Sequence, residues 1–205
     1  MFSDLKYKTD DKKALIMCNK LASCKEDVLR LEKILNGYGF DVCKKVECYP
    51  KIEIRKFLKS VKSEDLIYIH YSGHGIKRGK MIDGKYKIVS SWVNPDGSVV
   101  CSNEIDNILS QYNTQIIFTT DSCNSAVFAD FYKGNSLTFI GTSKINTTSK
   151  TYSLNGEPVH GSLVYLFEYL IQQNIEINIE NIEKFGMGFF KENKIDSTLI
   201  IKRFQ

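Results

Sequence analysis

The chain has 205 residues, of which 42% are hydrophobic and 25% are charged, and its formal net charge is +4. This composition excludes disordered, collagen-like and fibrous proteins and is typical of a globular chain with one sizeable core. The charge is too small to indicate nucleic-acid binding, which usually needs a pronounced basic stripe. Because we find no signal-peptide-like start and no apolar run of transmembrane length, we expect a cytoplasmic protein without a membrane partner.

Short apolar runs alternate with helical periodicity in the first third of the chain. An apolar run predicts a strand over residues 14–18, and alternation predicts another over 40–46. Apolar positions at helical spacing predict helices over 24–38 and 50–61. Residues 66–71 form an unbroken apolar run, which is typical of a parallel strand buried on both faces.

The rest of the chain continues this pattern after one polar interruption. Residues 76–101 are rich in Gly, Lys, Asp and Ser, so we expect a loop, with a hairpin at most, and we interpret its basic stretch as a solvated loop rather than a polyanion site. The remaining elements are expected at 105–112 (helix), 115–120 and 137–142 (strands), 160–173 (helix), 179 onward (helix) and 198–204 (strand). The order predicts an α/β fold with a mostly parallel sheet, in which ligands bind beyond the carboxyl ends of the strands.

The six cysteines are scattered without regular spacing, which is typical of free thiols in a reducing compartment. We expect Cys18, Cys43, Cys48 and Cys101 to be small packing residues. No zinc site is predicted, because Cys43 and Cys48 have no matching second pair.

Two polar side chains follow two of the buried strands directly. His74 lies between two glycines after the third strand, and Cys123 follows a later strand in the run Asp-Ser-Cys-Asn-Ser. A thiol that faces an imidazole forms an ion pair, which lowers the pKa of the thiol and supplies a proton to a leaving amine. The other two histidines have simpler explanations: His70 is expected in the core, and His160 at a helix start, capping it or facing solvent.

The motifs His70-Tyr-Ser-Gly-His-Gly75 and Asp121-Ser-Cys-Asn-Ser125 resemble those of metacaspases, which belong to the caspase-like clan of cysteine peptidases (peptidase C14 type). The resemblance covers most of the chain. It implies a caspase-like α/β/α three-layer sandwich with a mostly parallel sheet of about six strands. It also implies a single peptidase domain over residues 1–205, with a larger part over 12–131 and a smaller part over 137–205.

The resemblance assigns roles to individual residues. It makes Cys123 the nucleophile and His74 the base, and it places an oxyanion hole at the backbone amides of Gly75 and Cys123. It also implies a pocket for the substrate side chain, lined by Cys24, Asp27, Ser72 and Asp121. Two carboxylates in one narrow pocket favour an Arg or Lys side chain and disfavour an acidic one.

The sequence departs from the family pattern in three places. Asn124 and Ala126 stand where metacaspases usually have His and Gly. Among residues that match calcium ligands, only Asp83 and Asp130 are candidates, and Ser102-Asn103 replaces an acidic pair, so we expect weak calcium binding or none and no required cofactor. The segment after the nucleophile helix, residues 132–136, is too short for the family's cleavable linker.

These observations predict a monomeric cysteine endopeptidase that cleaves protein or peptide substrates after Arg or Lys. One alternative is a catalytically inactive caspase-like module that binds or regulates partners. Another is a flavodoxin-like nucleotide binder, which the lack of a glycine-rich phosphate loop after the first strand disfavours.

Overall fold

The computed structural model describes residues 11–20, 22–144, 146 and 161–204. Its main sheet has six strands in the order β2-β1-β3-β7-β8-β9, and only the last pair is antiparallel. The six strands are β1 (Lys12–Cys18), β2 (Asp41–Val46), β3 (Leu66–Gly73), β7 (Gln115–Ser122), β8 (Leu137–Gly141) and β9 (Ile200–Phe204). The mostly parallel sheet expected from the sequence is therefore confirmed.

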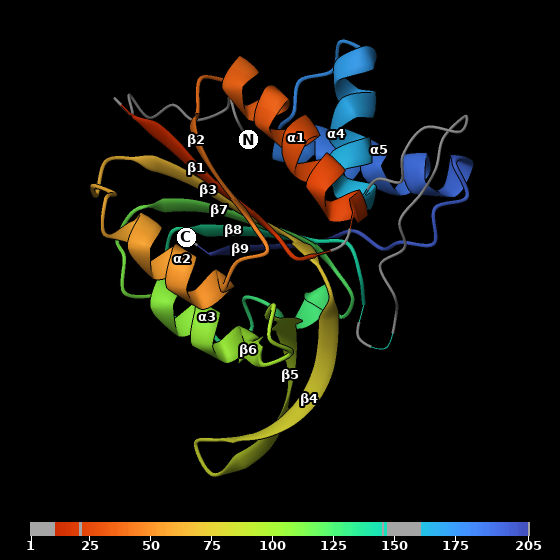
Figure 1. Ribbon diagram of the computed structural model, residues 1–205. Helices are drawn as coiled ribbons and strands as arrows, with labels where there is room; N and C mark the ends of the chain where they lie inside the picture. The colour runs from red at the N-terminus through yellow and green to blue at the C-terminus, as the bar shows by residue number, and fades with distance from the viewer. Residues whose placement is uncertain (1–10, 21, 145, 147–160, 205) are drawn as a thin grey trace.

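Helices cover both faces of this sheet (Figure 1). The helices are α1 (Ala22–Gly37), α2 (Pro50–Leu58), α3 (Ser102–Leu109), α4 (Ser162–Gln172) and α5 (Ile179–Glu192). Helices α1, α4 and α5 lie on one face, and α2 and α3 lie on the other. Two apolar clusters, one on each face, form the core, which confirms the three-layer α/β/α sandwich.

The sequence pattern explains why the central strands are buried on both faces. In β1 and β3 nearly every side chain is buried, as expected for parallel strands covered by helices on each side. The ambiguous region after α4 forms a helix, α5, as the sequence favoured. Its start is capped by the side chain of Asn178, which accepts a hydrogen bond from the amide of Asn181 at 2.8 Å.

For residues 76–101 we expected a loop with room for a hairpin; the hairpin is present, but the expectation of a loop elsewhere in this region was wrong. This region forms a second, three-stranded antiparallel sheet of β4 (Gly75–Ile82), β5 (Lys85–Val93) and β6 (Val99–Cys101). Strands β4 and β5 form a hairpin that projects from the body (Figure 1), and it turns at Asp83 and Gly84, which both have positive φ. Its outer half is largely exposed, and in the sequence only the short run over residues 85–88 alternates polar with apolar residues.

None of the six cysteines, all of which lie in the part of the chain that the structure describes, forms a disulfide bond. Cys18 and Cys101 are buried and Cys48 packs against the core, as expected of packing residues. The same expectation was wrong for Cys43, which is exposed because β2 is an edge strand of the main sheet. Among the described residues, no helix is long and apolar enough to cross a membrane.

Candidate active site

The two residues expected to do the chemistry lie at adjacent strand ends. Strands β3 and β7 are parallel neighbours, and their register pairs Gly73 with Ser122. His74 directly follows Gly73, and Cys123 directly follows Ser122. The two residues therefore lie side by side at the carboxyl edge of the sheet. The His74 side chain is exposed and Cys123 is partly buried, so both are open to a substrate.

Gly75 brings the histidine segment against the nucleophile. A β-carbon at position 75 would lie 2.2 Å from the carbonyl oxygen of Cys123, so only glycine fits there. The carbonyl of His74 accepts hydrogen bonds from the amide of Val93 at 3.3 Å and from the hydroxyl of Tyr71 at 3.4 Å. The backbone that carries the histidine is therefore fixed by strands β3 and β5.

A buried aromatic stack packs beside the strand ends that carry His74 and Cys123. Trp92 on β5 is fully buried, and its ring stacks on Tyr71 at 4.2 Å and on Phe128 at 4.6 Å between centroids. Such pairs add to the apolar area that they bury. The stack links the strand before His74, the second sheet and the segment after Cys123 in one packed unit.

Asp27 on α1 is fully buried beside these strand ends. Its carboxylate accepts hydrogen bonds from the hydroxyl of Ser72 at 2.7 Å and from the amide of Gly161 at 2.8 Å. Burial raises the pKa of Asp27 to about 7, and the charge of Asp121 adds to this effect, although the two hydrogen bonds oppose it. Asp27 therefore titrates near neutral pH.

Asp121 is the second buried carboxylate of the site. It accepts hydrogen bonds from the Thr142 hydroxyl at 2.6 Å, from the Ser162 hydroxyl at 3.1 Å and from the Leu163 amide at 2.8 Å. Burial raises its pKa above the ordinary value despite these bonds. The carboxylate thus lies at the start of α4, where helix amides favour negative charge.

The residues expected to line a substrate pocket do come together. Asp27 and Asp121 face the same small space, because a β-carbon at Gly161 would lie 2.4 Å from an oxygen of Asp121 and 2.8 Å from one of Asp27. Ser72 pairs in register with Asp121, and Cys24 is buried one helical turn before Asp27. All four candidates therefore lie in one region, at the carboxyl ends of β3 and β7.

The residues that close this site were missed by the sequence analysis. They are Thr142, Gly161, Ser162 and Leu163. The Gly-Ser pair at the start of the predicted helix over 160–173 was the available signal, since a small residue there leaves space for a buried side chain.

His70, the other histidine that the structure describes, lies in the core rather than at the strand ends. His70 is buried in β3, and its Nδ1 atom lies 2.8 Å from the hydroxyl oxygen of Thr119, as expected for a core histidine. Burial lowers its pKa to about 3, so it stays neutral at physiological pH. His160 and most of the expected polar loop, residues 147–159, lie outside the described residues.

The two calcium candidates are not brought together. Asp83 lies in the turn of the β4–β5 hairpin, and Asp130 is bound by the ammonium of Lys202. Among the described residues, no group of three or more His, Cys, Asp or Glu side chains is placed to hold a metal ion. These residues therefore do not fit a calcium ion, which needs six or more oxygens, many of them charged.

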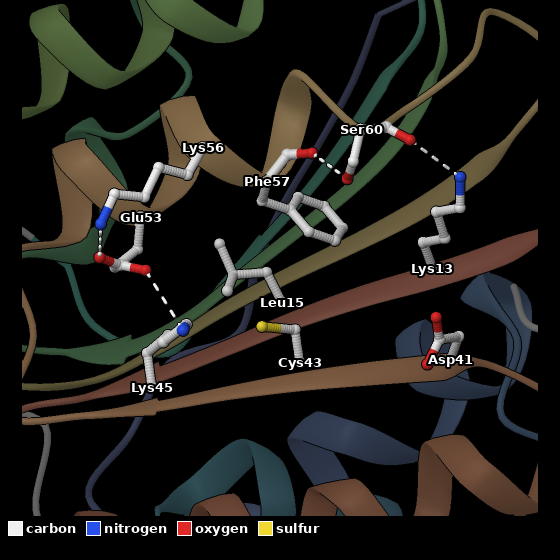
Figure 2. Close-up of a pocket in the computed structure, with 9 residues that line it drawn as sticks. All are labelled: Lys13, Leu15, Asp41, Cys43, Lys45, Glu53, Lys56, Phe57 and Ser60. Atoms are coloured by element: carbon white, nitrogen blue, oxygen red, sulfur yellow. Dashed lines mark hydrogen bonds and ion pairs between the residues drawn. The ribbon is translucent and has the colours of Figure 1, made fainter.

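A pocket of about 430 Å³ lies elsewhere, between α2 and the first two strands (Figure 2). It lies along the first half of β1 and most of β2, and neither His74 nor Cys123 lines it. Its cations Lys45 and Lys56 both pair with Glu53, at 3.6 and 3.1 Å. We assign this pocket no part in the chemistry.

Comparison with known proteins identifies the family. A family model described as the caspase domain of peptidase C14 matches residues 11–181. The chain belongs to the caspase family. The metacaspase resemblance noted above thus falls in a family that this comparison supports independently.

Two solved structures share this caspase fold. The first, a protein from Geobacter sulfurreducens, is 15% identical with a TM-score of 0.71, and the match covers 94% of this chain and 92% of that protein. The second, the caspase drICE, is 15% identical with a TM-score of 0.59, and the match covers 98% of this chain and 94% of drICE. At this identity they show the caspase fold alone.

One curated protein matches over a shorter stretch. Aldo-keto reductase family 1 member C1 from Pongo abelii is 33% identical over 79 residues, which are 37% of this chain. The chain spans 21% of that protein's length, so we carry nothing of its activity over to this caspase-family chain.

Proposed function

We propose that this caspase-family protein is a cysteine endopeptidase of the metacaspase type, which cleaves peptide bonds after Arg or Lys. The observation that carries the proposal is the register of β3 and β7, which puts His74 and Cys123 side by side. A nucleophile and a base that emerge from neighbouring strand ends form the arrangement that covalent acyl transfer needs.

In the proposed reaction the Cys123 thiolate attacks the carbonyl carbon of the scissile bond. The carbonyl electron pair moves onto oxygen, then returns as the carbon–nitrogen bond breaks, and His74 gives its proton to the leaving amine. Water, deprotonated by His74, then hydrolyses the thioester and regenerates the Cys123 thiol. No metal ion or other cofactor enters this sequence of steps.

The amides of Gly75 and Cys123 are our candidates for the oxyanion hole. The bond from the Val93 amide to the His74 carbonyl makes the adjacent pair of Gly75 and Trp92 a non-hydrogen-bonded one. The amide of Gly75 therefore points away from β5, and the close contact of Gly75 with the Cys123 backbone supports this role. Donors fixed in this way stabilise developing negative charge without reorganising.

The carboxylates of Asp27 and Asp121 support the preference for a basic side chain. Each carries buried negative charge at some energetic cost, as their raised pKa values indicate, and a substrate cation would relieve that cost. Arg can make two parallel charge-assisted hydrogen bonds there, and Lys can make a point-charge contact. An acidic substrate side chain would meet two like charges.

One observation favours a second candidate function, a catalytically inactive module that binds partners. Gly161, Ser162 and Leu163 at the start of α4 already enclose both carboxylates. A substrate cation therefore has to displace this segment to reach the carboxylates. If the segment stays in place, the protein keeps the caspase fold but does not bind a basic substrate side chain.

Fluorogenic peptides that end in Arg, Lys or Asp distinguish the two candidates. We expect wild-type protein to cleave after Arg and Lys only, without added metal, and Cys123→Ala and His74→Ala to lower the rate by at least about a hundredfold. Cys43→Ala is the matched control, because this thiol is exposed on an edge strand far from the site. No turnover of any substrate would leave the inactive module as the function; equal cleavage after Asp would contradict the role of the acidic pocket.

A further inference from the structure

Lys202 on β9 reaches across the sheet edge to the segment that follows the nucleophile. Its stem lies on Phe139, its register partner on β8, with the ammonium 5.7 Å from the ring centroid. Three oxygens of one short stretch accept its hydrogen bonds: the carbonyl oxygens of Ala126 and Phe128 and a carboxylate oxygen of Asp130. An ammonium has three N–H donors, so these three acceptors satisfy its hydrogen-bonding capacity.

A second ionic side chain holds the same stretch through its amides. Asp106 on α3 is fully buried, and its two carboxylate oxygens accept hydrogen bonds from the amides of Ala129 at 3.0 Å and Phe131 at 3.1 Å. The Lys202 ammonium thus holds carbonyl groups of the segment, and the Asp106 carboxyl group, whose pKa burial raises to about 7, holds amide groups of the same segment from another element. Bonds to charged groups are stronger than bonds between neutral groups.

The segment needs such support because its backbone is strained. Asn124, the residue after the nucleophile, has φ of 59°, and Ala129 has φ of 66°. Both lie in the left-handed region, which costs a non-glycine residue about 1 kcal/mol or more and persists only where the surroundings enforce it. Ser143 adds contacts at the start of the segment, where its hydroxyl accepts from the amide of Asn124 at 3.2 Å.

We propose that Lys202 is a positioning residue for the nucleophile: its ammonium fixes residues 126–130 and thereby keeps Cys123 beside His74 and Gly75. This inference rests on the proposed peptidase function. The side chain of Lys202 is only 24% exposed, and it acts through the backbone of the segment rather than on the substrate. Removing its charge would leave three converging oxygens without their donor, and the strained turn would relax.

Loss of positioning has a kinetic signature that loss of substrate binding lacks. Lys202→Met keeps the apolar stem on Phe139 and removes the charge, so we expect kcat to fall by about tenfold to a hundredfold with KM changed less than about threefold. Arg203→Met is the matched control. Arg203 is the next residue on β9, faces the other side of the sheet and pairs with Glu183 at 2.7 Å, so kcat should stay within about twofold of wild type.

Chemical rescue separates a missing cation from general damage. Lys202→Ala removes the part of the side chain that propylammonium resembles, so this ion should restore part of the lost kcat in a saturable way. The same ion should not rescue Lys202→Met, whose stem fills the space, and sodium chloride at equal ionic strength should rescue neither. A loss of kcat in Lys202→Ala that propylammonium leaves unchanged would contradict the role of the ammonium.

Amide hydrogen exchange tests the inference without any turnover. In Lys202→Met the amides of residues 124–131 should exchange at least about tenfold faster than in wild type, while the same peptide in Arg203→Met keeps its protection. If Lys202→Met does not fold, Asp130→Asn should show a smaller change of the same kind, because Asp130 is 47% exposed and leaves two carbonyl partners for Lys202. An inactive wild type would refute the peptidase proposal alone; unchanged exchange and unchanged kcat in the folded variants would refute the role of Lys202.

Discussion

Gly75 and Cys123 lie so close that a β-carbon on Gly75 would stand 2.2 Å from the carbonyl oxygen of Cys123. The obstacle is backbone, which cannot rotate away as a flexible side chain would. Gly75→Ala should therefore push the two strand ends apart and lower kcat/KM by about a hundredfold, together with a lower melting temperature.

Gly37→Ala is the control for this substitution. A β-carbon at Gly37 meets nothing within 4 Å, and the residue is the last of α1, so the variant should keep wild-type activity and stability. Peptide cleavage and thermal unfolding measure both variants. Wild-type activity in Gly75→Ala would show that the contact is not needed for the site.

Asp27→Asn should change how stability depends on pH. The pKa of Asp27 is raised from 3.8 to about 7, so the folded protein binds the Asp27 proton more tightly than the unfolded chain does. The stability that this proton contributes is full below about pH 4 and is lost as the pH rises through about 7. Asp27→Asn, which has no such proton, should gain stability relative to wild type as the pH rises from 5 to 8.

Asp65→Asn is the control with the opposite sign. Asp65 pairs with Lys13 at 2.8 Å, and this hydrogen bond holds the pKa of Asp65 below its ordinary value despite the opposing effect of burial. Its substitution should therefore destabilise the protein at neutral pH and matter less in acid. Urea unfolding at several pH values gives both curves, and parallel curves for wild type and Asp27→Asn would contradict the assignment.

The same carboxylate should set the pH dependence of substrate binding. Only the ionised form of Asp27 attracts a basic side chain, so KM for an Arg substrate should rise as the pH falls below about 7. In Asp27→Asn this dependence should flatten, and KM for Arg and Lys substrates should exceed the wild-type value throughout. A steady-state pH profile of KM checks this, and a profile that is unchanged by the substitution would exclude Asp27 from the pocket.

The positions of the proposed catalytic pair could be predicted from the sequence because their signal is local. His74 and Cys123 each follow an apolar strand directly, and parallel neighbours bring their carboxyl ends to one edge. The extent of strand structure over residues 76–101 was underestimated for the opposite reason: the outer strands are largely exposed, and only the short run over 85–88 alternates polar with apolar residues.

The partners of the buried charges could not be predicted, because they are distant in the chain. Asp27 takes its amide donor from Gly161, 134 residues away, and Lys202 reaches Ala126 over 76 residues. No periodicity or spacing encodes such contacts, which exist only once the sheet has ordered its strands. The sequence therefore singled out Asp27 and Asp121 as candidates, but it gave no indication of the groups that bind and enclose their carboxylates.

Gly161→Ala should damage the acidic site specifically. A β-carbon there would lie 2.4 Å from a carboxylate oxygen of Asp121, and the amide of Gly161 also donates to Asp27. We expect weaker binding of Arg substrates and a loss of stability of about 1 to 3 kcal/mol. Gly188→Ala on α5, where a β-carbon meets nothing within 4 Å, should instead stabilise the protein by about 0.5 to 1 kcal/mol. Equal effects of the two substitutions on KM and unfolding would contradict a special role for Gly161.

Calcium and chelators should leave the activity unchanged. The carboxylate of Asp130, the calcium candidate nearest the nucleophile, accepts a hydrogen bond from the Lys202 ammonium, and Asp83 lies in the turn of the projecting hairpin. A calcium ion at Asp130 would have to displace a lysine that also binds two carbonyl groups, and like charges oppose its approach. Initial rates with added calcium, with EGTA and with neither should agree within about twofold for wild type. A clear increase with calcium would show that the ion binds at a site other than the one that Lys202 holds.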